Sequence, residues 1–144
     1  MVKIPTSEAR SAIMRRIRRQ NTAPELAVRR MLHRMGYRFR LHAKELPGSP
    51  DVVFRPRKAV IFVHGCFWHG HHCRWGRPVR ANAEYWAAKI DRNQRRDADS
   101  MAALYAKGWQ ALIVWECELK NADTLSCKLQ NFLESVSTEP KIDG

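Results

Sequence analysis

Metal-binding side chains are concentrated in one short stretch of this chain. From residue 64 to residue 73 the sequence reads HGCFWHGHHC, with four histidines, two cysteines and two large aromatic residues. Cysteine thiolates and histidine imidazoles are the ligands that zinc prefers in proteins. Aromatic rings placed between such ligands suggest a surface that stacks on a flat partner. The stretch is therefore the first candidate for the functional site.

A third cysteine follows the apolar segment at residues 109–115 and completes a possible zinc site. The candidate ligands are Cys66, His71, Cys73 and Cys117. Three thiolates and one imidazole make a closed tetrahedral site, the usual structural type. His71 is favoured as the fourth ligand because it is close to Cys73, but spacing alone leaves His69 and His72 open. Cys127 is not needed for this site, and we expect it to be a buried or free thiol.

A zinc ion closed by four protein ligands has no open position, so catalysis needs other groups. Asp51 opens an apolar strand after the Pro47–Pro50 turn, and Val63 closes the next strand. A carboxylate on one strand and a main-chain carbonyl on its neighbour can bind Mg²⁺ beside a phosphodiester. His64 or His69 could then take a proton from the attacking water. The plain alternatives are a turn aspartate and spare solvated histidines.

The charge of the chain indicates its partner. Lysine and arginine number 26 against 14 aspartates and glutamates, which gives a net charge of +12. Such a balance favours a polyanion, with nucleic acid first and an acidic membrane surface second. No apolar stretch reaches the ~18–20 residues of a membrane span, and the N-terminus does not read as a secretory signal. We expect a cytoplasmic protein with reduced cysteines.

The N-terminal segment predicts a basic amphipathic helix over residues 6–19. Met14 and Ile17 lie on its narrow apolar stripe among several arginines. It could be an arm that docks onto a partner or a surface helix packed on the domain. We therefore divide the chain into an arm at residues 1–20 and a single domain at residues 21–144.

The following elements predict an α/β fold. Thr22, with Pro24 in the first turn and Glu25 three residues after the cap, predicts the start of a helix that ends at Gly36. Alternating or apolar runs predict strands at residues 37–41, 51–54, 59–63 and 109–115. Asn82 is expected to cap a long helix to about residue 107, and a last helix covers residues 123–136. This order implies a mixed sheet flanked by helices.

Three segments together resemble one enzyme family. They are LPGSPD at residues 46–51, VIFVHGCFWH at residues 60–69 and IVWEC at residues 113–117, supported by SAIMRRI at residues 11–17. Pro50 and Asp51 before paired strands match the PD-(D/E)XK nuclease core, although its usual acidic-x-Lys tripeptide is absent at residues 62–64. The combination is similar to the very-short-patch-repair (Vsr-type) DNA mismatch endonucleases, which implies a restriction-endonuclease-like core with a structural zinc site.

The resemblance implies a Mg²⁺-dependent enzyme that nicks DNA on the 5′ side of the mispaired thymine in a T:G mismatch. It implies that Asp51 and the main chain of Val63 bind Mg²⁺, and that His69 is the general base or positions the attacking water. Glu25 would assist through metal-bound water, in addition to its place in the capping box, and His64 would contact the phosphate or the hydration shell of the metal. The zinc ligands implied are Cys66, His71, Cys73 and Cys117.

The resemblance also implies how such an enzyme reads DNA. Phe67, Trp68 and Trp86 would wedge into the T:G step, because a mismatch unstacks at lower cost than a matched pair. Lys89 and Asn93 share the helix face of Trp86 and would reach base edges. Met14 and Ile17 of the arm would approach the minor groove. The rings could instead simply cover the zinc site.

Two departures and two alternatives accompany this reading. Relatives commonly carry threonine where this chain has Val63, which matters only if the hydroxyl is used, and Gly70 interrupts the histidine run. The alternatives are a nuclease of the same fold that needs no mismatch, and a zinc-stabilised DNA-binding module without catalysis. We expect a monomer acting on double-stranded DNA, with other repair proteins as possible partners.

Overall fold

The structure is a computed structural model that describes residues 22–71, 73 and 82–136. The predicted arm helix, with Met14 and Ile17, lies outside these residues, as do His72 and the C-terminal segment from residue 137. Within the described ranges, no helix is both long and apolar enough to cross a bilayer.

A four-stranded mixed sheet forms the centre of the domain, as the sequence predicts. Its strands are β1 (Arg40–Leu41), β2 (Val52–Phe54), β3 (Ala59–His64) and β4 (Gln110–Trp115). They lie side by side in the order β1-β2-β3-β4, with the first two pairs antiparallel and β3 parallel to β4. The central strands are short apolar runs buried on both faces, which is the pattern of a sheet covered by helices on each side.

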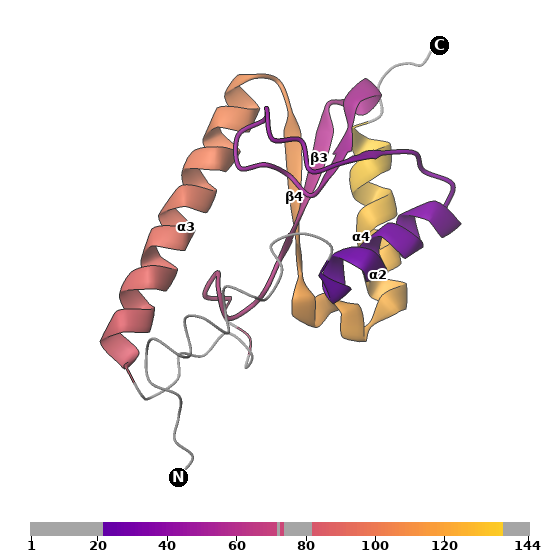
Figure 1. Cartoon of the computed structure of the whole chain (residues 1–144). Helices are drawn as coiled ribbons and strands as arrows, with labels where there is room; N and C mark the ends of the chain where they lie inside the picture. Colours follow the sequence, from indigo (N-terminus) through magenta and orange to yellow (C-terminus); the bar gives the residue numbers. More distant parts are fainter. Residues whose placement is uncertain (1–21, 72, 74–81, 137–144) are drawn as a thin grey trace.

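Helices cover the two faces of the sheet. They are α2 (Ala23–Arg34), α3 (Ala83–Ala106) and α4 (Ala122–Ser135). Figure 1 shows α3 alone on one face and α2 with α4 on the other. Two apolar clusters match this arrangement: Leu32 and Leu129 pack with Ile61 on the α2 and α4 side, and Leu104 packs with Val60 on the α3 side.

The predicted ends of α2 are confirmed. The Thr22 hydroxyl accepts a hydrogen bond from the Glu25 backbone N–H at 3.3 Å, and a proline occupies the first turn. Gly36 adopts a left-handed conformation (φ +88°), which turns the chain out of the helix and lets Tyr37 N–H donate to Leu32 O at 3.0 Å. This cap places Glu25 firmly on the first turn of α2.

Two predictions of local structure need correction. The strand expected at residues 37–41 is paired only at Arg40 and Leu41, because Tyr37 still takes part in the cap of α2 and the partner strand has three residues. Asn82 does occupy the N-cap position of α3, but its side chain makes no capping hydrogen bond and its backbone is left-handed (φ 59°). Of the two alternatives expected for Cys127, a buried or a free thiol, the structure shows a free and exposed one.

The strand directions bring the chemical groups to one edge of the sheet. β3 and β4 are parallel, with His64 opposite Trp115, so both strands end at the same edge. β2 is antiparallel to β3, so Asp51, which precedes it, lies at that edge as well. A short 3₁₀ helix at Glu116–Lys120 then turns the chain after β4 and carries Cys117. The loop at residues 65–73 starts from the same edge.

Candidate active site and cysteine–histidine cluster

Asp51 is held against the neighbouring strand. Its Oδ2 accepts a hydrogen bond from the Val63 backbone N–H at 2.7 Å. Burial, with a smaller contribution from the nearby Glu25 carboxyl, raises the pKa of Asp51 to about 7, although the Val63 hydrogen bond and Arg29 act to lower it. A buried and a half-buried carboxyl group thus lie close together, which is an environment that binds a cation well.

Glu25 is buried at the start of α2, with a side chain only 4% exposed. Its Oε1 lies 3.2 Å from Arg29 Nη2 and 3.3 Å from His42 Nε2. Ligand atoms of Glu25, His42 and Asp51 all lie within 4.8 Å of one another. Glu25 and Asp51 were predicted as site residues from the sequence, whereas His42 and Arg29 were not.

A second group of side chains surrounds His69. Its Nδ1 lies 2.5 Å from Asp97 Oδ2, and its ring stacks on that of His64 at 3.7 Å with an angle of 5°. An Asp97 carboxylate accepts the Nδ1 proton, which leaves Nε2 with the free lone pair. This is the arrangement in which a carboxylate orients a histidine for proton transfer.

His64 is the more buried of the two stacked rings. Burial, together with the neighbouring His69, lowers its pKa to about 4, although Asp97 acts to raise it. Its Nδ1 has no hydrogen-bond partner among the described residues, and Asp97 Oδ2 is 3.9 Å away. His64 is therefore neutral at pH 7 and offers an uncharged imidazole to the site.

α3 holds the histidine-rich loop in place. Asn93 Nδ2 donates to Trp68 O at 2.8 Å, and Gln94 Nε2 donates to His69 O at 3.1 Å. Gly70 is left-handed (φ +64°), and a Cβ there would lie 2.6 Å from the Ile90 methyl group. A glycine lets the loop approach the helix this closely.

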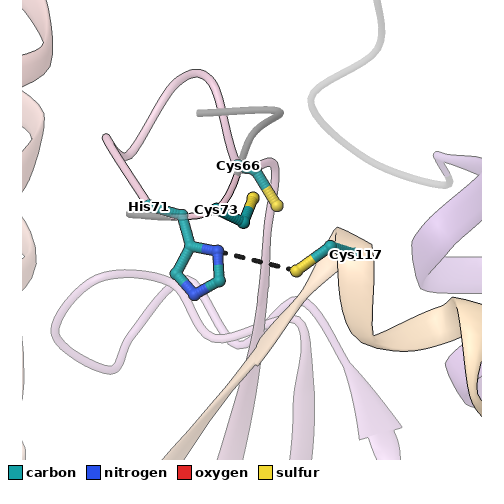
Figure 2. Close-up of side chains that lie close together, drawn as sticks. All are labelled: Cys66, His71, Cys73 and Cys117. Atoms are coloured by element: carbon teal, nitrogen blue, oxygen red, sulfur yellow. Dashed lines mark hydrogen bonds between the residues drawn. The ribbon is translucent and has the colours of Figure 1, made fainter. Parts of the chain in front are cut away.

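The four side chains selected from the sequence as zinc ligands lie close together. Cys66, His71 and Cys73 come from the loop, and Cys117 comes from the turn after β4. Their ligand atoms all lie within 4.8 Å of one another, and Figure 2 shows the three sulfurs and the His71 ring directed toward a common centre. Cys117 Sγ is 3.6 Å from His71 Nδ1.

The surroundings of the cluster disfavour the thiolate forms of Cys66 and Cys117. Burial raises the pKa of Cys66 to about 12, and burial also raises the pKa of Cys117. The His71 ring stacks on Trp115 at 4.1 Å, which fixes its orientation. Three soft donors and one imidazole at this spacing fit a tetrahedral zinc ion, which would hold the thiolates.

The aromatic residues selected from the sequence form one cluster. The rings of Phe67, Trp68 and Trp86 contact each other edge to face at 5.4–5.8 Å. Trp86 is only 3% exposed, whereas the adjacent Tyr85 is 43% exposed and contacts it at 4.9 Å. Lys89 Nζ lies 6.0 Å from the centre of the Tyr85 ring. The cluster adjoins the histidines through the loop.

One open pocket connects these groups. It encloses about 1070 Å³ and is lined by Glu25, Asp51, His64, His69, Trp86 and Asp97, among others. Carboxylates, imidazoles and aromatic rings thus share one concave surface. The residues of the cysteine–histidine cluster are not among those that line it.

The functional residues that sequence reasoning missed differ in the signal they leave. Asp97 lies four residues after Asn93 on α3, so extending the helical spacing of Trp86, Lys89 and Asn93 by one turn would have found it. His42 leaves no such signal. It follows a two-residue strand whose register no periodicity defines.

Comparison with known proteins shows the family to which this chain belongs. Residues 2–75 match the family model described as DNA mismatch endonuclease Vsr. The chain is 51% identical to the type II nicking enzyme V.XorIIP of Xanthomonas oryzae over 88% of this chain and 93% of the relative. It is 39% identical to the DNA mismatch endonuclease Vsr of Escherichia coli over 88% of this chain and 81% of the relative.

A third relative, the type II nicking enzyme V.NmeAIP of Neisseria meningitidis, is 41% identical over 84% of this chain and 86% of its own length. All these matches extend beyond the histidine-rich loop, and membership of the family implies a restriction-endonuclease-like core around the mixed sheet. The chain belongs to the Vsr family of DNA mismatch endonucleases.

Proposed function

We propose that this endonuclease uses Mg²⁺ to nick one strand of double-stranded DNA on the 5′ side of the mispaired thymine in a T:G mismatch. Such a nick would start the repair of deaminated 5-methylcytosine. The observation that carries the proposal is the pocket in which Asp51 faces the His69–Asp97 pair, in a chain whose relatives are named nicking enzymes and mismatch endonuclease.

Asp51 and the main chain of Val63 are the groups that would hold the magnesium ion. The hydrogen bond from Val63 N–H to Asp51 Oδ2 already fixes the Asp51 carboxylate next to Val63, so metal binding would cost little side-chain entropy. Because the Val63 contribution is from the backbone, valine serves as well as threonine there. When bound, Mg²⁺ supplies positive charge against the phosphate oxygens. Glu25 adds a second carboxylate at this position.

His69 is the proposed general base. Asp97 holds the Nδ1 proton, so Nε2 can accept a proton from the attacking water, and the resulting imidazolium is stabilised by the Asp97 carboxylate. The neutral His64 packs flat against it and is placed to contact the phosphate. Loss of such an acid–base group typically slows a reaction about 10²–10⁴-fold.

The cysteine–histidine cluster is the proposed structural zinc site. Cys66, His71 and Cys73 would anchor the loop to Cys117 after β4. The loop has little apolar core of its own, so a metal that ties both its ends to the sheet would stabilise it directly. This anchors Phe67 and Trp68 at one side of the pocket.

The aromatic cluster is the proposed mismatch reader. Phe67 and Trp68 are half-buried on the loop, whereas Trp86 is covered, so insertion of all three rings into DNA requires the cluster to part. The Asn93 side-chain amide donates a hydrogen bond to Trp68 O. A base contact by Asn93, which we propose together with one by Lys89, would therefore be coupled to the position of the Trp68 ring. Met14 and Ile17 would contact the other groove.

The net charge of +12 supports DNA as the partner, and one nick needs one active site. We therefore propose that the protein acts as a monomer on DNA in the bacterial cytoplasm.

Mapping of the cut tests the proposal. A T:G duplex labelled on either strand is incubated with the protein and Mg²⁺ and run on a denaturing gel. The expected product is a single cut in the thymine strand, immediately 5′ to the mispaired base. Cuts in both strands, or equal cuts in a matched C:G duplex, would instead indicate the broader nuclease. Binding without any cut would indicate a DNA-binding module.

A further inference from the structure

His42 lies at the wall of the active-site pocket in an unusual backbone conformation. It follows β1 with a left-handed backbone (φ 50°), which non-glycine residues seldom adopt and which occurs preferentially at functional sites. Its N–H donates to Asp51 O at 3.2 Å, so the two residues are joined through their backbones. The imidazole is consequently positioned relative to Asp51 by the sheet edge itself.

The His42 ring makes contacts that cannot all be favourable at once. Nε2 lies 3.3 Å from Glu25 Oε1 and also 3.3 Å from Arg29 Nη2. A protonated Nε2 can donate to Glu25, but it then faces the Arg29 donor. An unprotonated Nε2 can accept from Arg29, but its lone pair then faces the carboxylate oxygen.

A divalent cation would resolve this conflict. Arg29 Nη2 lies 3.2 Å from Glu25 Oε1 and 3.3 Å from His42 Nε2, so a positive group already contacts both of these side chains. Ligand atoms of Asp51, Glu25 and His42 lie within 4.8 Å of one another. That is near the ~4.2 Å that separates opposite ligands around an ion with bonds of about 2.1 Å. A small side-chain movement would close the site.

The ligand set also determines which metal is preferred. Mg²⁺ takes oxygen ligands and keeps several waters, whereas an imidazole suits later transition metals better and Mn²⁺ accepts both oxygen and nitrogen. An imidazole beside two carboxylates therefore shifts the selectivity of the site toward Mn²⁺ and the metals that follow it.

We propose that His42 is a direct ligand of the cation held by Asp51 and Glu25, and that this imidazole makes the site bind Mn²⁺ more tightly than Mg²⁺. The proposal rests on the proposed function in one respect, because it assumes that this cation is the one used for cleavage. The competing role for His42 is to orient Glu25 from a position outside the metal's ligand shell.

The variant for the test is His42→Asn. Asparagine tolerates the left-handed backbone better than most residues, so the substitution removes the imidazole with little added strain. The matched control is His33→Gln. His33 is exposed on α2 and does not line the pocket, and glutamine is a good helix former, so the substitution should leave α2 intact. Circular dichroism and thermal melts of the zinc-loaded full chain verify that each variant is folded.

The experiment titrates Mn²⁺ into each protein and follows free Mn²⁺ by electron paramagnetic resonance, then displaces it with Mg²⁺. In the wild type we expect stronger binding of Mn²⁺ than of Mg²⁺, and pulsed spectra with modulation from a bound imidazole nitrogen. His42→Asn should lose that modulation and lower the preference for Mn²⁺ about tenfold or more. His33→Gln should match the wild type.

A folded His42→Asn protein that keeps both the nitrogen modulation and the Mn²⁺ preference would overturn the proposal. Equal losses for Mn²⁺ and Mg²⁺ with no nitrogen modulation in the wild type would overturn it too, and would assign His42 to orienting Glu25. These readouts do not depend on cleavage. A protein that shows the imidazole signal but does not nick T:G DNA would contradict the proposed function alone. A protein that nicks T:G DNA but shows no imidazole signal would contradict the His42 assignment alone.

Discussion

At the scale of single residues, the ionised Asp51 carboxylate that metal binding requires lowers the stability of the folded protein. The pKa of Asp51 is raised from its ordinary value of 3.8 to about 7, chiefly by burial, so the folded state binds more protons than the unfolded state between these values. Stability therefore falls as the pH rises through this window and is not recovered above it. A bound cation would remove this penalty.

Asp51→Asn tests this reading. The asparagine carbonyl can still accept from Val63 N–H, but it does not ionise. In the presence of a chelator, the variant should gain stability over the wild type as the pH rises from about 4 to 7, on the order of a few kcal/mol. Denaturant unfolding at several pH values measures the difference, and nicking should be abolished. A constant difference across the range would contradict the account.

Asp97 is predicted to position His69. Asp97→Asn replaces an acceptor for the His69 Nδ1 proton by a group that can also donate, which favours the wrong tautomer. We expect single-turnover nicking to slow by about 10²-fold or more while DNA affinity stays near that of the wild type. Nicking by the folded Asp97→Asn protein at the wild-type rate would reduce Asp97 to a structural contact.

At the scale of elements, the position of the histidine-rich loop depends on how closely the loop approaches α3. Gly70→Ala adds a Cβ that would lie 2.5 Å from Gln94 Nε2 and 2.6 Å from the Ile90 methyl group, at a left-handed position. Gly36→Ala is the matched control, because Gly36 is also left-handed but has no atom within 4 Å of an added Cβ.

Both substitutions should cost about 1 kcal/mol of stability through the backbone conformation. Gly70→Ala alone should also displace His69 and slow nicking in the folded protein. Rates measured below the melting temperature of each variant separate the two effects. Equal nicking by both variants would show that the loop does not need the glycine for its position.

The cysteine–histidine cluster connects two elements, and its removal should affect both. Cys117→Ser should lower bound zinc and the melting temperature, since it deletes the ligand that joins the loop to the end of β4. Cys127→Ser is the control, because Cys127 is free and exposed on α4. Elemental analysis and thermal melts report the outcome. Full zinc content in Cys117→Ser would show that the ligand set is wrong.

The whole molecule shows which features a sequence can predict. Apolar runs and the Thr22 cap predicted the central strands and α2, because burial and capping are local consequences of residue type. The proximity of Cys66, Cys73 and Cys117 was predictable since cysteines are chemically distinctive, whereas spacing alone did not separate His71 from His69 and His72. The extent of β1 was not, because pairing depends on the length of the partner strand.

The contacts of the active site were less accessible to sequence reasoning. Asp97 reaches His69 across 28 positions of sequence, and His42 reaches Glu25 across 17. Helical spacing can place Asp97 on the right face of α3, but both contacts depend on how α2, α3 and the sheet edge are packed, which no local pattern encodes. Charge, in contrast, is a property of the entire chain, and the net charge of +12 favoured a polyanionic partner, with nucleic acid first and an acidic membrane surface second.

The central claim is that this endonuclease recognises a T:G mismatch and cuts with Mg²⁺, and one competition assay tests it most directly. A T:G duplex and its matched C:G duplex, with different fluorescent labels, are mixed in equal amounts with excess protein, and Mg²⁺ starts the reaction. The account predicts that only the T:G duplex is nicked and that a chelator stops the reaction. Equal rates of cutting on the two duplexes, or cutting that persists in the chelator, would contradict it.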